Sequence, residues 1–168
     1  MKKLLVTLCV ALLSLGAYAQ QAGDFAVGAK GSFGFNESRI GFGLKAQYNI
    51  TKHIRAEVEG DYWPVKEHAS DVMAFANVHY LVNVGERFFV YPIAGVGVSF
   101  VKSEEYTANF GKSSLHYSAS NYTDFGFQVG VGAQLGLTDN LFLMAEVKYQ
   151  PGVWSNFVYA NLGVGFKF

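Results

Sequence analysis

The amino-acid sequence predicts an all-β protein, folded as an eight-stranded antiparallel up-and-down transmembrane β-barrel. Three observations predict this fold. Apolar and polar residues alternate with a period of two through eight segments, as in strands with one apolar face. The connections between these segments alternate between short and longer ones. After residue 19, no run approaches the roughly 18 apolar residues of a membrane-crossing helix, so a chain that crosses a membrane here does so with strands.

The first 19 residues have the composition of a signal peptide. Lys2 and Lys3 form a short basic region, and residues 4–15 form an apolar stretch of about 12 residues, too short to cross a bilayer. Residues 16–19 (GAYA) supply the small residues of a cleavage site. We expect residues 1–19 to be removed on export and residues 20–168 to form one outer-membrane barrel domain.

The eight predicted strands follow the signal peptide in an even series. The alternation places them at residues 24–35, 39–50, 53–63, 71–83, 87–100, 123–137, 141–150 and 156–168. Three connections are tight turns rich in Gly, Asn and Asp: residues 50–52, 84–86 and 138–140. The other four are residues 36–38, 64–70, 101–122 and 151–155. Short turns on one side and longer loops on the other are typical of outer-membrane barrels, and an even strand number places both termini on the short-turn side.

The two faces of the strands differ most clearly in the second, third and sixth segments. One face of these segments is apolar, with residues such as Leu44, Val58 and Phe127, and the other is dominated by Gly, Ala, Ser and Gln with a few charges of both signs. Small residues suit the interior of a narrow eight-stranded barrel, so we expect the apolar face to meet lipid. A secreted soluble barrel is the alternative, and its outward polar face would carry more Lys and Glu.

Aromatic residues near the strand ends support the same orientation. We expect them to form girdles at the two membrane interfaces: Tyr48, Tyr62, Trp63, Tyr80, Phe100, Tyr149 and Trp154. Charged residues make up only 15% of the chain, which is low for a water-exposed surface, where about 25–35% is usual.

Charged residues on the polar face form the first candidate site. They are Lys30, Lys45, Arg55, Glu57, Glu59, Glu146, Lys148 and Lys167, with Asp61 near the loop end of its strand. An enclosed charge is costly unless it is paired and hydrogen-bonded, so these residues predict an ion-pair network that fills the lumen. The alternative is a narrow, gated ion path lined by the same groups.

The longest predicted loop, residues 101–122, is the second candidate site. It holds Tyr106, Phe110, His116, Tyr117 and Tyr122 among Ser, Asn, Glu and Lys, a composition typical of adaptable contact surfaces. External loops often carry the function of a barrel. Alternatively, the flanking strands continue beyond the membrane and the segment is only the tip of a hairpin.

The sequence offers little for catalysis, metal binding or nucleic-acid binding. Residues 66–71 (KEHASD) hold Ser, His and acids, but neighbours in a polar loop do not define a triad. Glu67, His68 and Asp71 could be metal ligands, although solvated loop polarity explains them better. The formal net charge is zero, with 13 basic and 13 acidic residues. We therefore expect no catalytic residue, no cofactor, no metal site and no nucleic-acid partner.

The last strand ends in the pattern polar–x–Gly–x–x–apolar–x–apolar, carried by Asn161, Gly163, Phe166 and Phe168. This pattern resembles the C-terminal insertion signal of bacterial outer-membrane β-barrel proteins. With the signal peptide and eight strands, the chain is similar to the small outer-membrane barrels that include the OmpA transmembrane domain and OmpX.

The resemblance implies the bacterial outer membrane as the location and the barrel assembly machinery as a partner. It also implies contacts with outer-membrane lipid and lipopolysaccharide, and with a surface ligand or host protein through the loops. The function expected from it is a structural or surface-interaction role (adhesion or envelope contact). A narrow porin or small-solute transporter is the alternative.

Deletion of Phe168 is expected to lower the amount of barrel in the outer membrane more than the loss of one side chain would. The reason is that Phe168 ends the expected insertion signal. The measurement is immunoblotting of outer-membrane fractions, with Lys52→Ala as a control in a turn. Normal levels of the deletion variant would argue against the signal role.

Overall fold

The computed structural model describes residues 22–36, 38–66, 69–103, 106–110, 113–117, 120–151 and 156–168. The side chains of residues 65, 66, 69, 103, 106–110, 113–117 and 120 lie outside the description. The expected signal peptide also lies outside it and stays a prediction. Within the described residues, no helix is long and apolar enough to cross a membrane.

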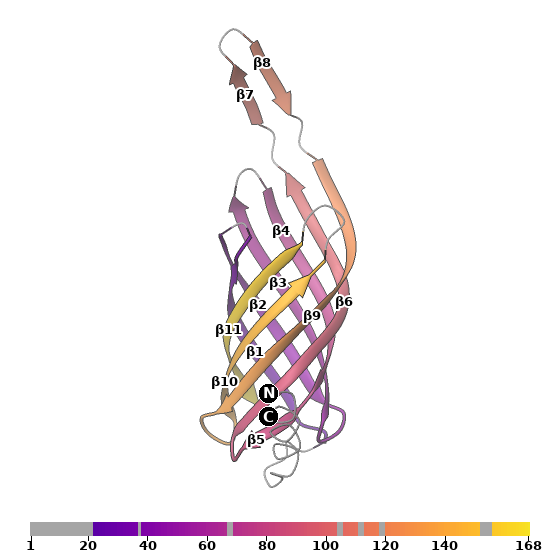
Figure 1. Ribbon diagram of the computed structural model, residues 1–168, viewed down its shortest axis with the longest axis vertical. Coiled ribbons are helices and arrows are strands. Elements are labelled where there is room, and N and C mark those ends of the chain that lie inside the picture. Colours follow the sequence, from indigo (N-terminus) through magenta and orange to yellow (C-terminus); the bar gives the residue numbers. More distant parts are fainter. Residues whose placement is uncertain are drawn as a thin grey trace, which may run out of the picture.

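The described chain forms a closed antiparallel barrel of eight strands, as predicted (Figure 1). Its strands are β1 (Phe25–Gly34), β2 (Arg39–Asn49), β3 (Ile54–Lys66), β4 (Ala69–Tyr80) with its continuation β5 (Val82–Gly85), β6 (Phe88–Ser103), β9 (Ser120–Gly136), β10 (Leu141–Gln150) and β11 (Phe157–Lys167). Leu81 interrupts the fourth barrel strand between β4 and β5, and both parts pair with β6.

The barrel closes where the first and last strands meet. β1 pairs with β11 in one continuous register from Ala26↔Lys167 to Gly34↔Tyr159. The backbone N–H of Phe168 donates a hydrogen bond of 2.9 Å to the carbonyl of Phe25, which extends this seam to the C-terminus. Closure leaves the described barrel strands paired on both sides over most of their length, which removes the free edges that an open sheet would expose.

The two longest strands, β6 and β9, reach the end of the barrel opposite the C-terminus, where the last residue of β6 pairs with the first residue of β4 (Figure 1). β6 has 16 residues and β9 has 17, and they pair as far as Ser103↔Ser120. Beyond them, β7 (Tyr106–Phe110) and β8 (Ser113–Tyr117) form a separate antiparallel hairpin. The prediction of a loop over residues 101–122 was therefore wrong: the flanking strands continue into this segment and a hairpin follows them, as the alternative expected. Both faces of a strand meet water outside a membrane, so apolar and polar residues need not alternate there. The backbone pairing can therefore continue where the sequence pattern no longer indicates a strand.

The connection between β3 and β4 is also shorter than predicted. The expected loop at residues 64–70 overlaps the two strands, because β3 continues to Lys66 and β4 begins at Ala69. The register shifts between Trp63 and Lys66, so Pro64 lies in an irregular part of the ladder. Bulges and edges are where a strand tolerates proline, so β3 can continue past Pro64.

The orientation of the two faces agrees with the prediction. Outward residues are large, apolar and exposed, with Phe125 at 78% and Leu162 at 71% exposure, while Lys30, Glu57 and Lys148 are buried in the interior. Of the expected girdle residues, the exposed ones are Tyr48, Tyr62, Tyr80, Phe100 and Tyr149, and Trp154 lies outside the described residues.

Trp63 corrects the girdle prediction. Its side chain is completely buried in the lumen, where its indole lies over Gly41. The period of two places Trp63 on the same inward face as Glu59 and Asp61, and this periodicity prevails over the usual preference of Trp for the interface. A side chain at Gly41 would collide with the indole, so the glycine makes the space for it.

Candidate functional site: the charged lumen

A compact network of ion pairs fills the middle of the barrel. The ammonium of Lys148 lies 2.7 Å from Glu59 Oε1 and 3.2 Å from Glu146 Oε2. Lys45 Nζ lies 2.6 Å from Glu146 Oε1 and 3.0 Å from Glu57 Oε2. These five side chains have no exposed surface, so every charge is compensated inside the protein.

Lys30 extends this network toward the end of the lumen near the β3–β4 connection. Its ammonium pairs with Glu59 and lies 3.0 Å from Asp61 Oδ2. Asp61, expected near the loop end of its strand, is therefore a buried partner of the network. The four cations Lys30, Lys45, Arg55 and Lys148 equal in number the four anions Glu57, Glu59, Asp61 and Glu146. The central lumen is thus neutral when His79 is neutral.

Amide groups and the Tyr91 hydroxyl donate further hydrogen bonds to the three glutamates of the network. Asn77 Nδ2 donates to Glu57 and Glu59 at 3.0 and 2.9 Å, and Gln47 Nε2 donates to Glu57 at 2.7 Å. Gln128 Nε2 donates to Glu59 at 2.6 Å. Hydrogen bonds of this kind allow a buried ion pair to offset the cost of removing its charges from water.

The glycines of the polar face make the space for these long side chains. A Cβ atom at Gly43 would collide with Asp61 and lie 3.0 Å from Lys30 Cε, and one at Gly130 would lie 3.0 Å from Lys148 Cγ. Cross-strand register places Lys30 opposite Gly43 and Lys148 opposite Gly130. Small residues therefore face the large charged ones, which is how a narrow barrel fills its interior.

Two predicted members of the network have other partners. Arg55 donates to Asn49 Oδ1 at 3.0 Å and to Gln134 Oε1 at 2.9 Å, and its guanidinium lies 5.8 Å from the centre of the Tyr91 ring. Lys167 is apart from the cluster: its side chain is 32% exposed and its ammonium lies 3.3 Å from Asp24 Oδ2. Its place in the lumen network was predicted wrongly, because Lys167 is the last residue of β11 and reaches only the rim.

Apolar side chains lie on both sides of the charged network. Toward the hairpin end, one buried cluster consists of Trp63, Met73, Phe75 and Tyr159, with Phe157 packed against it. Toward the C-terminal end, two clusters consist of Leu81, Phe89, Tyr91 and Ile93, and of Ala26, Phe142 and Met144. These layers separate the charges from water at both ends. Their alternation with outward residues is the only sign of these layers in the sequence, and aromatic residues near strand ends also fit an interface girdle.

The structure also contains polar residues that the sequence did not single out. Arg39 Nη1 donates to Asp71 Oδ2 at 2.6 Å near the hairpin end. His79 is fully buried, with its Nε2 3.4 Å from Glu57 Oε1 and its ring stacked on that of Tyr91. Arg39 was missed because it begins its strand, where alternation carries little information.

Three carboxylates in the lumen are close enough together to suggest a metal site. Oxygen atoms of Glu57, Glu59 and Glu146 lie within 4.8 Å of one another. Lysine ammonium groups already compensate all three, with Lys148 within 3.7 Å of each. A divalent cation would have to displace these lysines, so the cluster suits a structural role better than metal binding.

Of the other predicted site residues, those of the expected loop lie toward the hairpin end, and the terminal pattern runs along β11 from the charged network to the C-terminus. Tyr122 is 49% exposed on β9. The backbones of Tyr106, Phe110, His116 and Tyr117 lie in the β7–β8 hairpin, and their side chains are outside the described part of the chain. Within the terminal pattern, Asn161 is buried and Phe166 and Phe168 are exposed, with their rings 5.3 Å apart. Gly163 faces Lys30 across the seam. The insertion-signal role stays a prediction.

An apolar outer surface around a buried polar lumen, in a closed eight-stranded barrel, defines a transmembrane β-barrel. A family model described as "Outer membrane protein beta-barrel domain" matches residues 5–168. The chain therefore belongs to the outer-membrane β-barrel protein family, and its location is the bacterial outer membrane. No curated protein sequence matches it.

Several solved structures share this fold. The N-terminal β-barrel domain of Pseudomonas aeruginosa OprF has a TM-score of 0.61 at 19% identity, covering 89% of this chain and 100% of that one. Ail, the attachment invasion locus protein of Yersinia pestis, has a TM-score of 0.58 at 14% identity, covering 89% and 100%. Neisserial surface protein A (NspA) has a TM-score of 0.59 at 16% identity, covering 86% and 95%. At these identities the likeness establishes the fold alone.

Lys148→Met is expected to destabilise the barrel by about 3–5 kcal/mol, because Glu59 and Glu146 would stay buried without their shared cation. The measurement is urea-induced unfolding in phospholipid vesicles. The matched control is Arg87→Ala, which removes an exposed ion pair with Asp139 and should cost about 0–1 kcal/mol. Equal costs for the two variants would contradict a structural role for the network.

Proposed function

We propose that this protein is a structural and surface-interaction barrel of the outer membrane. In this proposal the lumen is filled by side chains, and the external segments contact other molecules in adhesion or envelope contact. The observation that carries it is the combination of a closed lumen with the projecting β7–β8 hairpin (Figure 1). Catalysis forms no part of the proposed function.

The packing of the lumen supports a role without transport. A solute that crossed the barrel would meet the layer around Trp63 and Phe75, then the ion pairs of Glu59, and then the layer around Phe89. Each ion pair that opened to let the solute pass would leave unpaired charges in the low-dielectric interior of the barrel. Unpaired buried charges carry a high cost in free energy. An eight-stranded barrel is also just wide enough for its side chains to fill.

The external extension supports an interaction role. β6 and β9 pair for three residues beyond the predicted strand end at Phe100, from Val101↔Tyr122 to Ser103↔Ser120, and the β7–β8 hairpin follows. This extension presents a Tyr-containing segment away from the membrane, and such segments make adaptable contact surfaces. Among the proteins of similar fold, Ail is described as an attachment invasion locus protein, and one of its structures is a complex with the heparin analogue sucrose octasulfate.

Other parts of the proposal concern export and assembly. In it, residues 1–19 direct export, and the terminal pattern ending at Phe168 is recognised by the barrel assembly machinery. The exposed rings of Phe166 and Phe168 beside the β1–β11 seam support this, since they are accessible where the barrel closes. Outer-membrane lipid and lipopolysaccharide are the proposed surroundings of the apolar face.

A narrow ion path is the second candidate function, and the charged lumen favours it. Rearranged lysine and glutamate pairs could conduct ions in small steps. Purified protein in planar bilayers is expected to show little or no conductance, because both apolar layers would have to open. Steady, large current steps from several preparations would overturn the closed-lumen proposal, and Lys148→Met protein would then show whether the network controls them.

Replacement of residues 104–119 by Asn-Gly is expected to abolish most surface binding while the barrel still forms. Ser103↔Ser120 is the last pair of the β6–β9 ladder, so a two-residue turn can close it. The measurement is adherence of bacteria that display the protein to cultured epithelial cells and to immobilised heparin. Lys52→Ala, in a turn at the opposite end, is the control.

Barrel formation in this experiment is checked by the different gel migration of boiled and unboiled samples. If the shortened variant binds both probes as well as the unaltered protein does, the hairpin is not the contact surface.

A further inference from the structure

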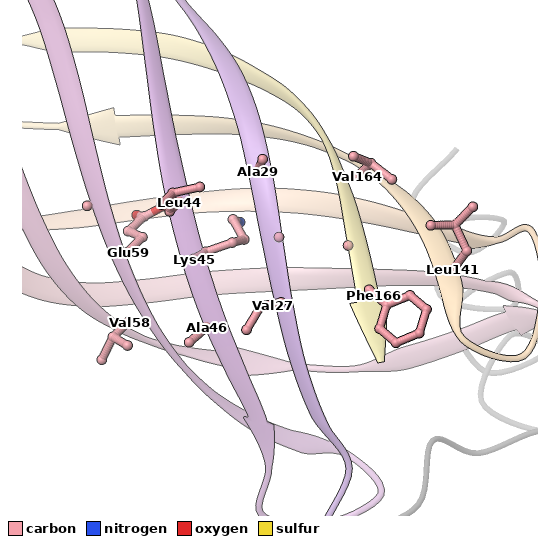
Figure 2. A pocket seen from close by; sticks show the side chains of 13 residues that line it. Val27, Ala29, Leu44, Lys45, Ala46, Val58, Glu59, Leu141, Val164 and Phe166 are labelled. Carbon is pink, nitrogen blue, oxygen red and sulfur yellow. The ribbon is translucent and has the colours of Figure 1, made fainter. Parts of the chain in front are cut away.

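A hollow of about 730 Å³ lies on the outer face of the barrel, across β11, β1, β2 and β3 (Figure 2). Its small lining residues are Ala29, Ala46 and Gly60, and the larger ones around them include Leu44, Val58 and Phe166. Leu44 is 69% exposed and Val58 59%, so the hollow opens outward. Lys45 and Glu59 are also among its lining residues, but their side chains are fully buried in the ion-pair network of the lumen.

The strand register explains why the surface is hollow here. Ala29 lies directly opposite Leu44, and Leu44 lies opposite Gly60 on the next strand. Ala46 lies opposite Val58 in the neighbouring row. Small outward residues therefore alternate with large ones across three strands. Because the lining side chains that face outward are apolar, a ligand here would be held by van der Waals packing alone, as in contacts within membranes.

The hollow lies toward the end of the barrel that carries the C-terminus. Leu141 directly follows the 138–140 turn, and it pairs with Phe166, which in turn pairs with Val27. Figure 2 shows Leu141 and Phe166 on one side of the hollow and Val58 on the other. Short turns of outer-membrane barrels lie on the periplasmic side, so the hollow faces the periplasmic leaflet of the bilayer.

We propose that this hollow is a binding site for an acyl chain of a phospholipid in the periplasmic leaflet. Its volume of about 730 Å³ leaves room for a segment of an acyl chain that enters from the bilayer. An acyl chain would stay at this site for a longer time than chains stay on the rest of the barrel surface. The reason is that it packs against a concave wall and not a convex one.

A second copy of the protein fits this surface less well. A two-fold dimer brings the same patch of both copies together, so the two hollows would face each other and enclose an empty space. Membrane interfaces depend on close packing, and such a void would remove the contacts that hold them together. An acyl chain has the shape and flexibility to fill the hollow from the bilayer side.

The test uses the mature protein in phosphatidylethanolamine–phosphatidylglycerol vesicles that contain phosphatidylethanolamine with a photoreactive diazirine in one acyl chain. After illumination, adducts are mapped by mass spectrometry. We expect several-fold more adducts on the peptides of β1 and β2 that line the hollow than on the outward residues of β9 and β10. Uniform labelling around the barrel would mean ordinary surrounding lipid and would overturn the proposal.

A pair of matched variants makes the test specific. Ala29→Leu with Ala46→Leu fills the hollow and should reduce its labelling to the level of the rest of the surface. Ala133→Leu with Ala145→Leu adds the same volume to a facing pair on β9 and β10, outside the hollow, and should leave the labelling of β1 and β2 unchanged. Gel migration of unboiled samples confirms that both variants fold.

Efficient disulfide cross-linking of Leu44→Cys between two copies in the same vesicles would assign the hollow to a protein contact and overturn the lipid proposal.

Discussion

The pairing of Glu59 with Lys148 and Lys30 is the interaction on which the interior of this barrel depends. Glu59 accepts hydrogen bonds from both lysines and from the amides of Asn77 and Gln128, so four other strands converge on one carboxylate. A buried carboxylate without these partners would be costly. The network therefore requires β1, β3, β4, β9 and β10 to be in register at the same time, and it can form only as the barrel closes.

The apolar layers at the two ends strengthen this arrangement. Trp63 and Phe75 on one side, and Phe89 and Phe142 on the other, are buried between the charges and water. Charges interact more strongly where water is excluded, and the cost of leaving one unpaired rises in the same way. The result is a stiff, neutral interior that holds the long β6 and β9 strands in place. This packing supports the proposed role of the barrel as a platform for the external hairpin.

The fold itself could be predicted from the sequence because alternation is a local property. In β3, the sequence Ile54–Arg55–Ala56–Glu57 shows both faces within four residues, and the burial of Arg55 and Glu57 follows. The candidate site could be predicted only in part. The alternation of inward and outward positions along each strand placed Lys30, Lys45, Glu146 and Lys148 inside. It did not indicate which lysine pairs with which glutamate. Lys45 and Glu146 are 101 residues apart, and only closure brings them together.

By itself, the sequence determined the strand number, the inward and outward faces, and the enclosure of charges of both signs, since each depends on neighbours along the chain. The tertiary structure decided the rest. It buried Trp63 over Gly41, left Lys167 at the rim with Asp24, continued β6 and β9 past the expected loop boundary, and hollowed the lipid-facing wall at Ala29 and Ala46. The physical reason is the same in each case: strand register and stagger set which side chains share a level of the barrel, and residues distant in the sequence determine that register together.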